Sequence, residues 1–343
     1  MSVAYTGAQF TGAAFEPIFQ EIMLQNATVA NELVTIDTNV KGNKPYTEVQ
    51  ASAGIRARIK TPGSGDTGGT VAFRDLLATP KYLMDYDEFD PIDYAVSRFN
   101  EDSLPGAFNV VGNRFVSEVI AARAPKMSLG LEQLFWAGAT AASKSTIAGV
   151  ATGTAQNQLG AAEKTLFAAL QTTEFDGVLA RLIQSYANGA NRIRRKVAGT
   201  TIDATNIDAE YAKLYANVVS AYNGSALLTP YNRDKVAIFA PYSHISFIET
   251  FNLNQTYRDK FTVSEDRQTY MYSGIRIQFV PLPENTMILF NGKNAVWATN
   301  TLDDFNSAKV DYLAANSSGM FWRADFSMDC VVMQPGQAIL YVG

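Results

Sequence analysis

The sequence contains very few of the side chains on which most enzyme chemistry depends. Its 343 residues include one cysteine and one histidine. The single cysteine, Cys330, excludes an intrachain disulfide and a thiolate metal cluster. Because Cys330 lies in an apolar, strand-like segment, we expect it to be a small buried hydrophobic residue. Histidine is the usual general base and the commonest metal ligand, so one histidine argues against most histidine-based enzymes.

That histidine, His244, falls in the first turn of a helix expected over residues 242–251. The apolar residues Ile245, Ile248 and Phe251 have the spacing of a stripe that faces a core. We therefore predict a helix-surface or capping role for His244 rather than catalysis. The sequence assigns no catalytic, cofactor-binding or metal-binding residue, implies no cofactor, and predicts that the chain is not an enzyme.

Long hydrophobic runs and an excess of positive charge are also absent. No apolar run approaches the ~20 residues that a membrane-spanning helix needs, and the first residues lack the basic and apolar blocks of a signal peptide. The net charge of -5 argues against a dedicated nucleic-acid binder but permits a protein that encloses nucleic acid. The 47% hydrophobic content indicates a globular chain with a sizeable core, and the length suggests about two domains.

The most regular patterns lie in the C-terminal half. Residues 236–240 predict a strand, and Pro241 opens the helix at residues 242–251. Ile275–Phe279 alternates apolar and polar side chains as a half-buried strand does, and ends before the prolines of a Pro-Leu-Pro segment. Residues 287–290 form an apolar run, and Asn291-Gly292 predicts a tight turn before a third run at residues 295–297.

The segment from Leu33 to Asp90 predicts β-structure throughout. Expected strands cover residues 34–38, 46–49, 55–60, 71–77 and 82–89, with a turn at residues 42–45. The glycine-rich loop at residues 61–70 separates two of them, which predicts an extended hairpin that projects from the body. An ordinary meander with a disordered surface loop is one alternative. A phosphate cradle is another, but the loop lacks both GxxxxGK[ST] and a GxGxxG that opens a helix.

Helical spacing follows this β-rich segment. A long helix is expected to begin at Ser103–Gly106 and to resume at Met127 after Pro125, which should kink or break it. Residues 139–160 have the small, polar composition of a linker. Three further helices are expected at residues 160–171, 175–188 and 208–222.

Residues 1–36 are apolar and poor in regular patterns apart from a short helix expected at residues 18–26. An arm that packs on a neighbouring subunit would explain this composition. A helix docked on its own domain is the alternative.

In its order of elements and in the segments GIRIQFVPLP and MILFNGKNAVWA, the chain resembles the major capsid proteins of tailed bacteriophages, the HK97-fold family. The resemblance implies an α+β fold with an N-terminal arm, an extended β-hairpin called the E-loop, a long spine helix in a peripheral domain, and an α/β axial domain. The implied boundaries are 1–36 for the arm, 37–90 for the E-loop, 91–160 for the peripheral domain, 161–298 for the axial domain, and 299–343 for closing strands that return to the peripheral domain. The closing strands would be residues 311–329 and 330–342.

The resemblance also implies a function. The chain would be a structural subunit that assembles with itself, as hexamers and pentamers, into the icosahedral head of a tailed phage. It would enclose double-stranded DNA without sequence-specific binding, and it would not associate with a membrane. Assembly would take place in the host bacterial cytoplasm. Portal, decoration and scaffolding proteins would be its partners. Residues 1–30 carry only Glu16 and Glu21 as charged residues, which predicts a separately encoded scaffold and an arm that survives in the mature shell.

Two alternatives stay open: an encapsulin-type nanocompartment shell, and a soluble α/β enzyme that uses carboxylates. Three charged features also need an explanation. The basic cluster Asn191–Lys196 could be a solvated turn or an interface with the acidic segment at residues 86–90. The carboxylates of Asp85, Asp87, Glu88, Asp90 and Asp93 could hold a hard cation, although they lack the EF-hand spacing. Some shells of this family join a loop lysine to an asparagine; Lys60 has a suitable position, but no partner asparagine is evident.

Overall fold

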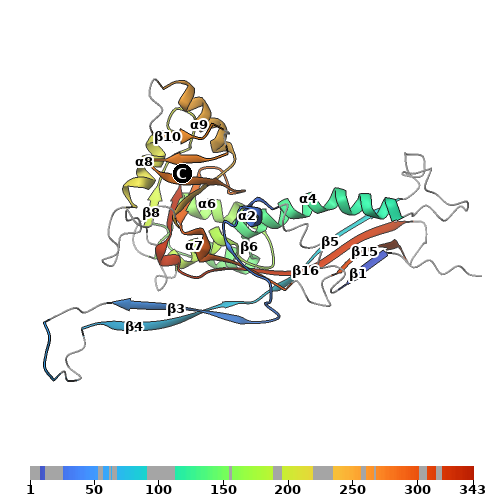
Figure 1. The fold of residues 1–343 in the computed structure, drawn as a ribbon, viewed down its shortest axis with the longest axis horizontal. Coiled ribbons are helices and arrows are strands. Elements are labelled where there is room, and N and C mark those ends of the chain that lie inside the picture. Colours follow the sequence, from blue (N-terminus) through green and yellow to red (C-terminus); the bar gives the residue numbers. More distant parts are fainter. Residues whose placement is uncertain are drawn as a thin grey trace, which may run out of the picture.

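A computed structural model describes residues 8–11, 26–52, 57–61, 63, 68–90, 113–153, 157–187, 195–218, 235–255, 260–265, 268–300, 307–313 and 319–343. These residues form two mixed layers of sheet and helix, from which a long hairpin projects (Figure 1). The predicted α+β fold class is confirmed. Three predicted features lie wholly or mostly outside the described residues: the N-terminal helix at residues 18–26 (all but Asn26), the helix start at residues 103–106, and most of the basic cluster.

A seven-stranded sheet occupies one end of the molecule, with the order β10-β11-β12-β9-β13-β17-β8. Its strands are β8 (Arg195–Ala198), β9 (Ala237–Ala240), β10 (Phe261–Val263), β11 (Tyr270–Tyr272), β12 (Ile275–Phe279), β13 (Thr286–Phe290) and β17 (Ile339–Val342). Strand β12 pairs parallel with β9, whereas β13 pairs antiparallel with both β9 and β17. The strands predicted at residues 236–240, 275–279 and 287–290 are therefore confirmed.

The central strands of this sheet are apolar throughout because both of their faces are covered. In β13, Met287 and Leu289 pack with helices α8 (Ile207–Ala216) and α9 (Ser243–Leu253), whereas Ile288 and Phe290 face a second core. Helices α4 (Asn113–Ala137) and α7 (Val178–Ala187) contribute to that second core, which we call the spine core. An unbroken apolar run is the pattern expected of a strand buried on both sides.

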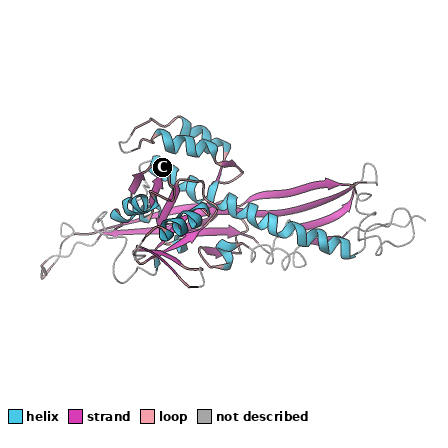
Figure 2. Ribbon diagram, turned by 90° about the horizontal axis from the view of Figure 1, so that it is seen from above, coloured by secondary structure: helices cyan, strands magenta, loops and turns pink. Residues whose placement is uncertain are grey.

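A six-stranded sheet lies beside the spine core. Its order is β1-β15-β16-β14-β2, with β5 also paired to β16. The bounds are β1 (Ala8–Thr11), β2 (Thr35–Asp37), β5 (Lys81–Phe89), β14 (Ala295–Thr299), β15 (Ser307–Tyr312) and β16 (Met320–Val332). Strand β16 is 13 residues long and pairs with β15 and β5 over its first part and with β14 over its last part. In both views the long strands run beside helix α4 (Figures 1 and 2).

The turn at Asn291-Gly292 connects the two sheets. It forms a short 3₁₀ helix, η5 (Gly292–Asn294), and the side chain of Asn291 accepts a hydrogen bond from the Lys293 amide at 3.1 Å. Although the tight turn was predicted, the strands on either side of it belong to different sheets. The sequence pattern identified the turn, but it did not show that the strands before and after the turn belong to different sheets.

Pro125 was expected to kink or break the long helix, and the expected break is wrong. Helix α4 runs unbroken from Asn113 to Ala137 with Pro125 inside it. Pro125 and its acceptor four residues earlier, Ala121, both lie on the exposed side of the helix. Water can hydrate the Ala121 carbonyl that proline leaves without a donor, so the helix is held by the packing of its buried side.

The prediction of a linker at residues 139–160 is also wrong in part. After the short strand β6 (Gly138–Ala139), residues 141–148 form helix α5 (Ala141–Ala148). The Thr140 side chain caps this helix by accepting a hydrogen bond from the Ser143 amide at 3.1 Å, and Ile147 is buried. Alanines favour helix, so a small-residue segment with a cap forms one once a core is available for Ile147.

The helices predicted at residues 160–171, 175–188 and 208–222 are present but shorter. They are α6 (Ala161–Ala169), α7 and α8, and α6 is followed by the short strand β7 (Gln171–Thr172). Helix α8 ends at Ala216 with Asn217 as its cap, not at Tyr222. Phe167 of α6 and most of α7 pack in the spine core, away from α8 and α9. The 161–298 segment, predicted as one axial domain, therefore contributes to both cores.

The projecting hairpin consists of β3 (Lys44–Ser52) and β4 (Thr70–Ala78), paired antiparallel over their whole length. The strand predicted at residues 55–60 is wrong for its described part, because residues 57–60 form no strand. Strand β5, included in the predicted 37–90 hairpin, pairs instead with β16. The hairpin is consequently shorter than the predicted segment.

The predicted closing strands are also divided differently. The antiparallel pair is β15 with β16, and a 3₁₀ turn, η6 (Pro335–Gln337), separates β16 from β17. Strand β17 does not return to the six-stranded sheet: it lies between β13 and β8 in the seven-stranded one. The register aligns Ile288 with Leu340, which places both side chains in the spine core.

Candidate assembly surfaces

The hairpin carries an apolar face that its own chain leaves uncovered. Phe73 is 72% exposed and Val71 is 62% exposed, and Val49 and Leu77 are exposed as well. Val49 lies directly opposite Phe73 in the antiparallel register, so these side chains share one face of the two strands. We call this surface, made of Val49, Val71, Phe73 and Leu77, the hairpin face.

The opposite side of the hairpin is anchored to the body near its root. Tyr46, Leu76 and the buried Ala78 pack with a small core formed by Val40, Val296, Ala298 and Val331. Beyond this root the strands extend away from both sheets (Figure 1). The hairpin thus has a fixed base and a projecting apolar part, which agrees with the prediction of a projecting hairpin.

A buried carboxylate holds the root in place. Asp329 of β16 accepts hydrogen bonds from the Thr79 amide at 2.7 Å, the Cys330 amide at 2.8 Å and the Arg181 Nη2 atom at 2.9 Å. Burial raises the pKa of Asp329, while the Arg181 charge and the amide hydrogen bonds act against that rise. Asp329 therefore ties the β4–β5 corner, strand β16 and helix α7 together.

A second exposed apolar surface lies on strand β5. Tyr82, Met84 and Tyr86 are exposed on one side of the strand, and the ring of Tyr86 lies 5.9 Å from that of Phe321 on β16. The alternate residues Leu83 and Phe89 pack against the spine core. We call the surface of Tyr82, Met84 and Tyr86 the β5 face.

The acidic residues of β5 are engaged within the chain. Asp85 accepts a hydrogen bond from the Trp322 ring at 2.8 Å, Asp87 forms an ion pair with Arg123 of α4, and Glu88 accepts one from Tyr86 at 2.5 Å. Asp93 lies outside the described residues. Across the described ranges, no group of three or more histidine, cysteine or acidic side chains could hold a metal ion.

The first helix described, α2 (Ala27–Ala30), docks on the spine helix of its own chain. Glu132 accepts hydrogen bonds from the Thr28 amide at 2.9 Å and the Thr28 hydroxyl at 2.5 Å, and Trp136 donates to the same hydroxyl at 2.8 Å. Burial raises the pKa of Glu132, and these hydrogen bonds oppose the rise. Strand β1 likewise pairs with β15 of the same chain. These two pieces of residues 1–36 therefore contact their own chain.

His244 is buried, so the expected helix-surface role is wrong. The side chain is 1% exposed, and its Nδ1 atom lies 3.0 Å from the Tyr211 hydroxyl of α8. Burial lowers the pKa of His244 to about 4, which leaves the imidazole neutral at pH 7. The first turn of α9 faces α8, a contact that the helix's own sequence does not reveal. His244 is thus a hydrogen-bonded core residue.

Cys330 is fully buried, as predicted, and burial raises the pKa of its thiol. Of the basic cluster, the backbone of Arg195 and Lys196 lies in β8, paired with Ile339 and Leu340. Lys60 is exposed near the end of the hairpin. No helix within the described ranges is both long enough and apolar enough to cross a membrane.

Comparison with known proteins gives the class of this fold. No family model matches the sequence, and no curated protein matches it. Among solved structures, a chain of the satellite phage P4 procapsid, in a structure that includes the size determination (Sid) protein, is similar with a TM-score of 0.55 at 9% identity. That match covers 99% of this chain and 91% of the other.

Two further structures agree. A chain from the capsid of the native GTA particle matches with a TM-score of 0.51 and 10% identity over 94% of this chain and 90% of that one. A chain from Microbacterium phage Oxtober96 matches with a TM-score of 0.50 and 10% identity over 100% and 94% of the two chains. The chain has the HK97-type fold of phage capsid proteins.

The sequence patterns had located the hairpin but not the β5 face. Residues 82–84 are all large and apolar, so the sequence does not show which of them face the core. The pattern of residues 82–89 is that of an ordinary half-buried strand. Which side of this strand faces water depends on the positions of β16 and α4.

Proposed function

We propose that this chain is a structural protein, the major capsid subunit that assembles into the icosahedral head of a tailed bacteriophage. The hairpin face carries the proposal, since it is a projecting apolar surface that a single subunit leaves in water. Such surfaces are uncommon on monomers and mark sites of protein association. The HK97-type fold supports the same conclusion, and no catalytic group enters the proposal.

The assembly contact that we propose joins two different surfaces. The hairpin face of one subunit lies on the β5 face of the next, so each subunit uses one surface of each kind. A head-to-tail contact of this type closes into rings when the rotation permits, which gives pentamers and hexamers. Including the arm at residues 1–36, we expect more than ~2,000 Å² to be buried, as in obligate assemblies.

The proposal extends to what the shell contains and what it meets. Double-stranded DNA is enclosed without sequence-specific binding, since an acidic chain of net charge -5 avoids tight attachment to phosphate. Assembly takes place in the host bacterial cytoplasm with a separate scaffolding protein, and a portal protein joins the shell. Of the domain boundaries given above, the arm at residues 1–36 and the peripheral domain at residues 91–160 remain part of this proposal. Strand β5 lies outside the E-loop, and strand β17 lies outside the closing strands.

Substituting Phe73 tests the contact. Phe73→Asp places a charge in the proposed interface, and we expect a folded subunit that fails to form shells, measured by light scattering and electron microscopy in the presence of scaffold. Leu253→Asp is the matched control, because Leu253 is 75% exposed on α9, outside both faces. Shell formation by Phe73→Asp at the level of the control, or a wild-type chain that stays monomeric with scaffold present, contradicts the proposal. DNA inside particles from infected cells separates a phage head from an encapsulin-type compartment.

A further inference from the structure

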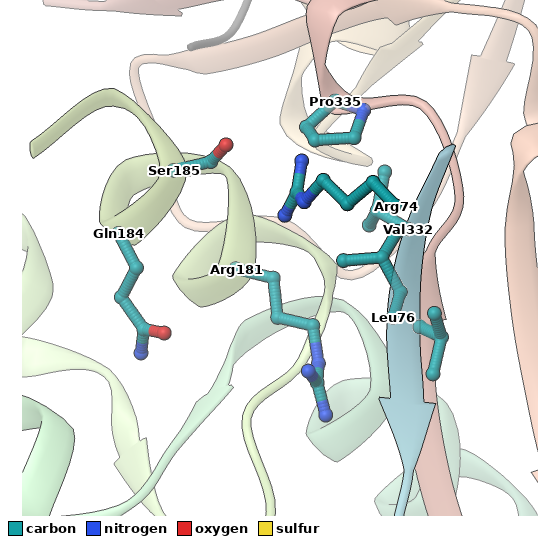
Figure 3. A pocket seen from close by; sticks show the side chains of 8 residues that line it. Arg74, Leu76, Arg181, Gln184, Ser185, Val332 and Pro335 are labelled. Carbon is teal, nitrogen blue, oxygen red and sulfur yellow. The ribbon is translucent and has the colours of Figure 1, made fainter. Parts of the chain in front are cut away.

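A cavity lies between the hairpin and helix α7. Its volume is about 140 Å³, and polar side chains from both elements reach it (Figure 3). The lining residues are Arg74 and Leu76 of β4, Arg181, Gln184 and Ser185 of α7, and Val331, Val332 and Pro335 near the end of β16. Any group bound here would contact the hairpin and the body at once.

Arg74 extends from β4 into this space. Its Nη1 atom is buried and has no hydrogen-bond partner among the described residues; Glu48 Oε2, on the opposite strand, lies 3.6 Å away. Burial lowers the pKa of Arg74, and the Glu48 charge only partly opposes this effect. Arg181 differs, because its Nη2 and Nε atoms donate to Asp329 and to the Asp176 carbonyl. Arg74 Nη1 is therefore ion-paired with Glu48 but still lacks a hydrogen-bond acceptor.

Ser185 faces Arg74 from the other wall. The residue is 9% exposed, and its hydroxyl oxygen has no hydrogen-bond partner in the described part of the chain. The hydroxyl points toward the Arg74 guanidinium, whereas Gln184 points away and donates to Asp176 at 3.0 Å (Figure 3). Buried polar groups are nearly always hydrogen-bonded. Two facing donors without a hydrogen-bond acceptor, one of them in an ion pair with Glu48, therefore indicate a site for an acceptor.

We propose that this cavity binds an oxyanion, a carboxylate or a phosphate, between the guanidinium of Arg74 and the hydroxyl of Ser185. A guanidinium presents parallel N–H groups that match the two oxygens of such an anion, and the hydroxyl adds a further donor. Glu48 competes for Arg74 and limits the affinity. The bound anion links β4 to α7 and so fixes the hairpin's direction.

The anion has two sources, which experiments distinguish. One is free inorganic phosphate. The other is the carboxylate of an aspartate or glutamate from a second copy of the chain, and this source rests on the proposed function. The phosphate arm uses the unassembled subunit, so its result does not depend on whether shells form.

In the first arm, sodium phosphate is titrated into the unassembled subunit by calorimetry, with sodium chloride at equal ionic strength as the blank. Arg74→Lys keeps the charge but loses the paired donors, and we expect at least about tenfold weaker binding. Ser185→Ala should weaken binding about threefold. Arg58→Lys and Ser145→Ala, both at exposed positions, should bind as the wild type does. Circular dichroism verifies that each variant is folded.

In the second arm, shell assembly of the same variants is followed by light scattering. If phosphate does not bind, reduced assembly by Arg74→Lys and Ser185→Ala, but not by the controls, identifies the carboxylate of a second copy. Phosphate binding with no assembly under any condition supports the site and refutes the proposed function. Equal phosphate binding by all variants, or no binding together with unchanged assembly, overturns the oxyanion site.

Discussion

Replacing Asp329 should separate the hairpin root from the body and destabilise the whole subunit. Asp329→Ala removes the carboxylate that accepts from the Thr79 amide and from Arg181 at 2.7 and 2.9 Å. Breaking a buried ion pair by removing one partner typically costs about 3–5 kcal/mol. Because the Arg181 side chain is 30% exposed, water can solvate it in the variant, and we take the lower end, about 3 kcal/mol.

Urea unfolding followed by tryptophan fluorescence measures this loss, since Trp136, Trp297 and Trp322 are all fully buried. The midpoint should fall while the slope m stays constant. Asp329→Asn keeps one acceptor for the Thr79 amide, so it should lose less, about 2 kcal/mol. It tests whether charge or hydrogen bonding dominates.

The control is Asp325→Ala on the same strand. Asp325 pairs with Arg323 at 2.7 Å, but the Arg323 side chain is 51% exposed, and pairs of this kind contribute about 0–1 kcal/mol. If Asp329→Ala loses no more stability than Asp325→Ala, then Asp329 does not anchor the root and the reasoning fails. A cycle with Arg181→Ala should show coupling above about 0.5 kcal/mol, since the two side chains are in contact.

Two further predictions concern the hairpin loop and the buried histidine. Deleting residues 62–69 should leave the subunit folded, with an unchanged thermal transition, but should reduce shell assembly in light scattering; a collapsed transition would show that the loop belongs to the core. Because the fold lowers the pKa of His244 from 6.5 to about 4, the unfolded chain binds the extra proton first as the pH falls, so stability should decrease between pH 6.5 and about 4, by up to about 3 kcal/mol. His244→Phe should remove that part of the pH dependence in urea titrations, and an unchanged slope with pH would refute the assignment.

Local patterns were sufficient to predict the strands and helices that begin or end beside a proline. Strand β12 alternates and stops before Pro281, and helix α9 follows Pro241, so both were found within two residues of their observed bounds. The projecting hairpin was predictable for a similar reason, because a glycine-rich loop separates two strand-like segments. These features depend on backbone geometry and on side chains close in sequence.

Long-range contacts decided the features that were missed. Pro125 stays inside α4 because its side of the helix faces water while the other side is packed in the spine core. His244 is buried because α8, about thirty residues earlier in the chain, supplies Tyr211. Strand β5 pairs with β16 and not within the hairpin, and β17 pairs within the seven-stranded sheet. Both pairings depend on strands that are distant in the sequence.

The sequence alone determined the fold class, the scarcity of catalytic side chains, and the presence of a projecting hairpin. The last two properties follow from composition and from periods of two and 3.6 residues, which are local, whereas the fold class came from the resemblance of the element order to a known family. Only the tertiary structure determined which apolar residues remain exposed, as Phe73 and Met84 do. It also determined which polar atoms lie buried, as Arg74 Nη1 and the Ser185 hydroxyl oxygen do. Burial depends on what lies opposite a side chain in space, and the pairing of distant strands and helices decides that.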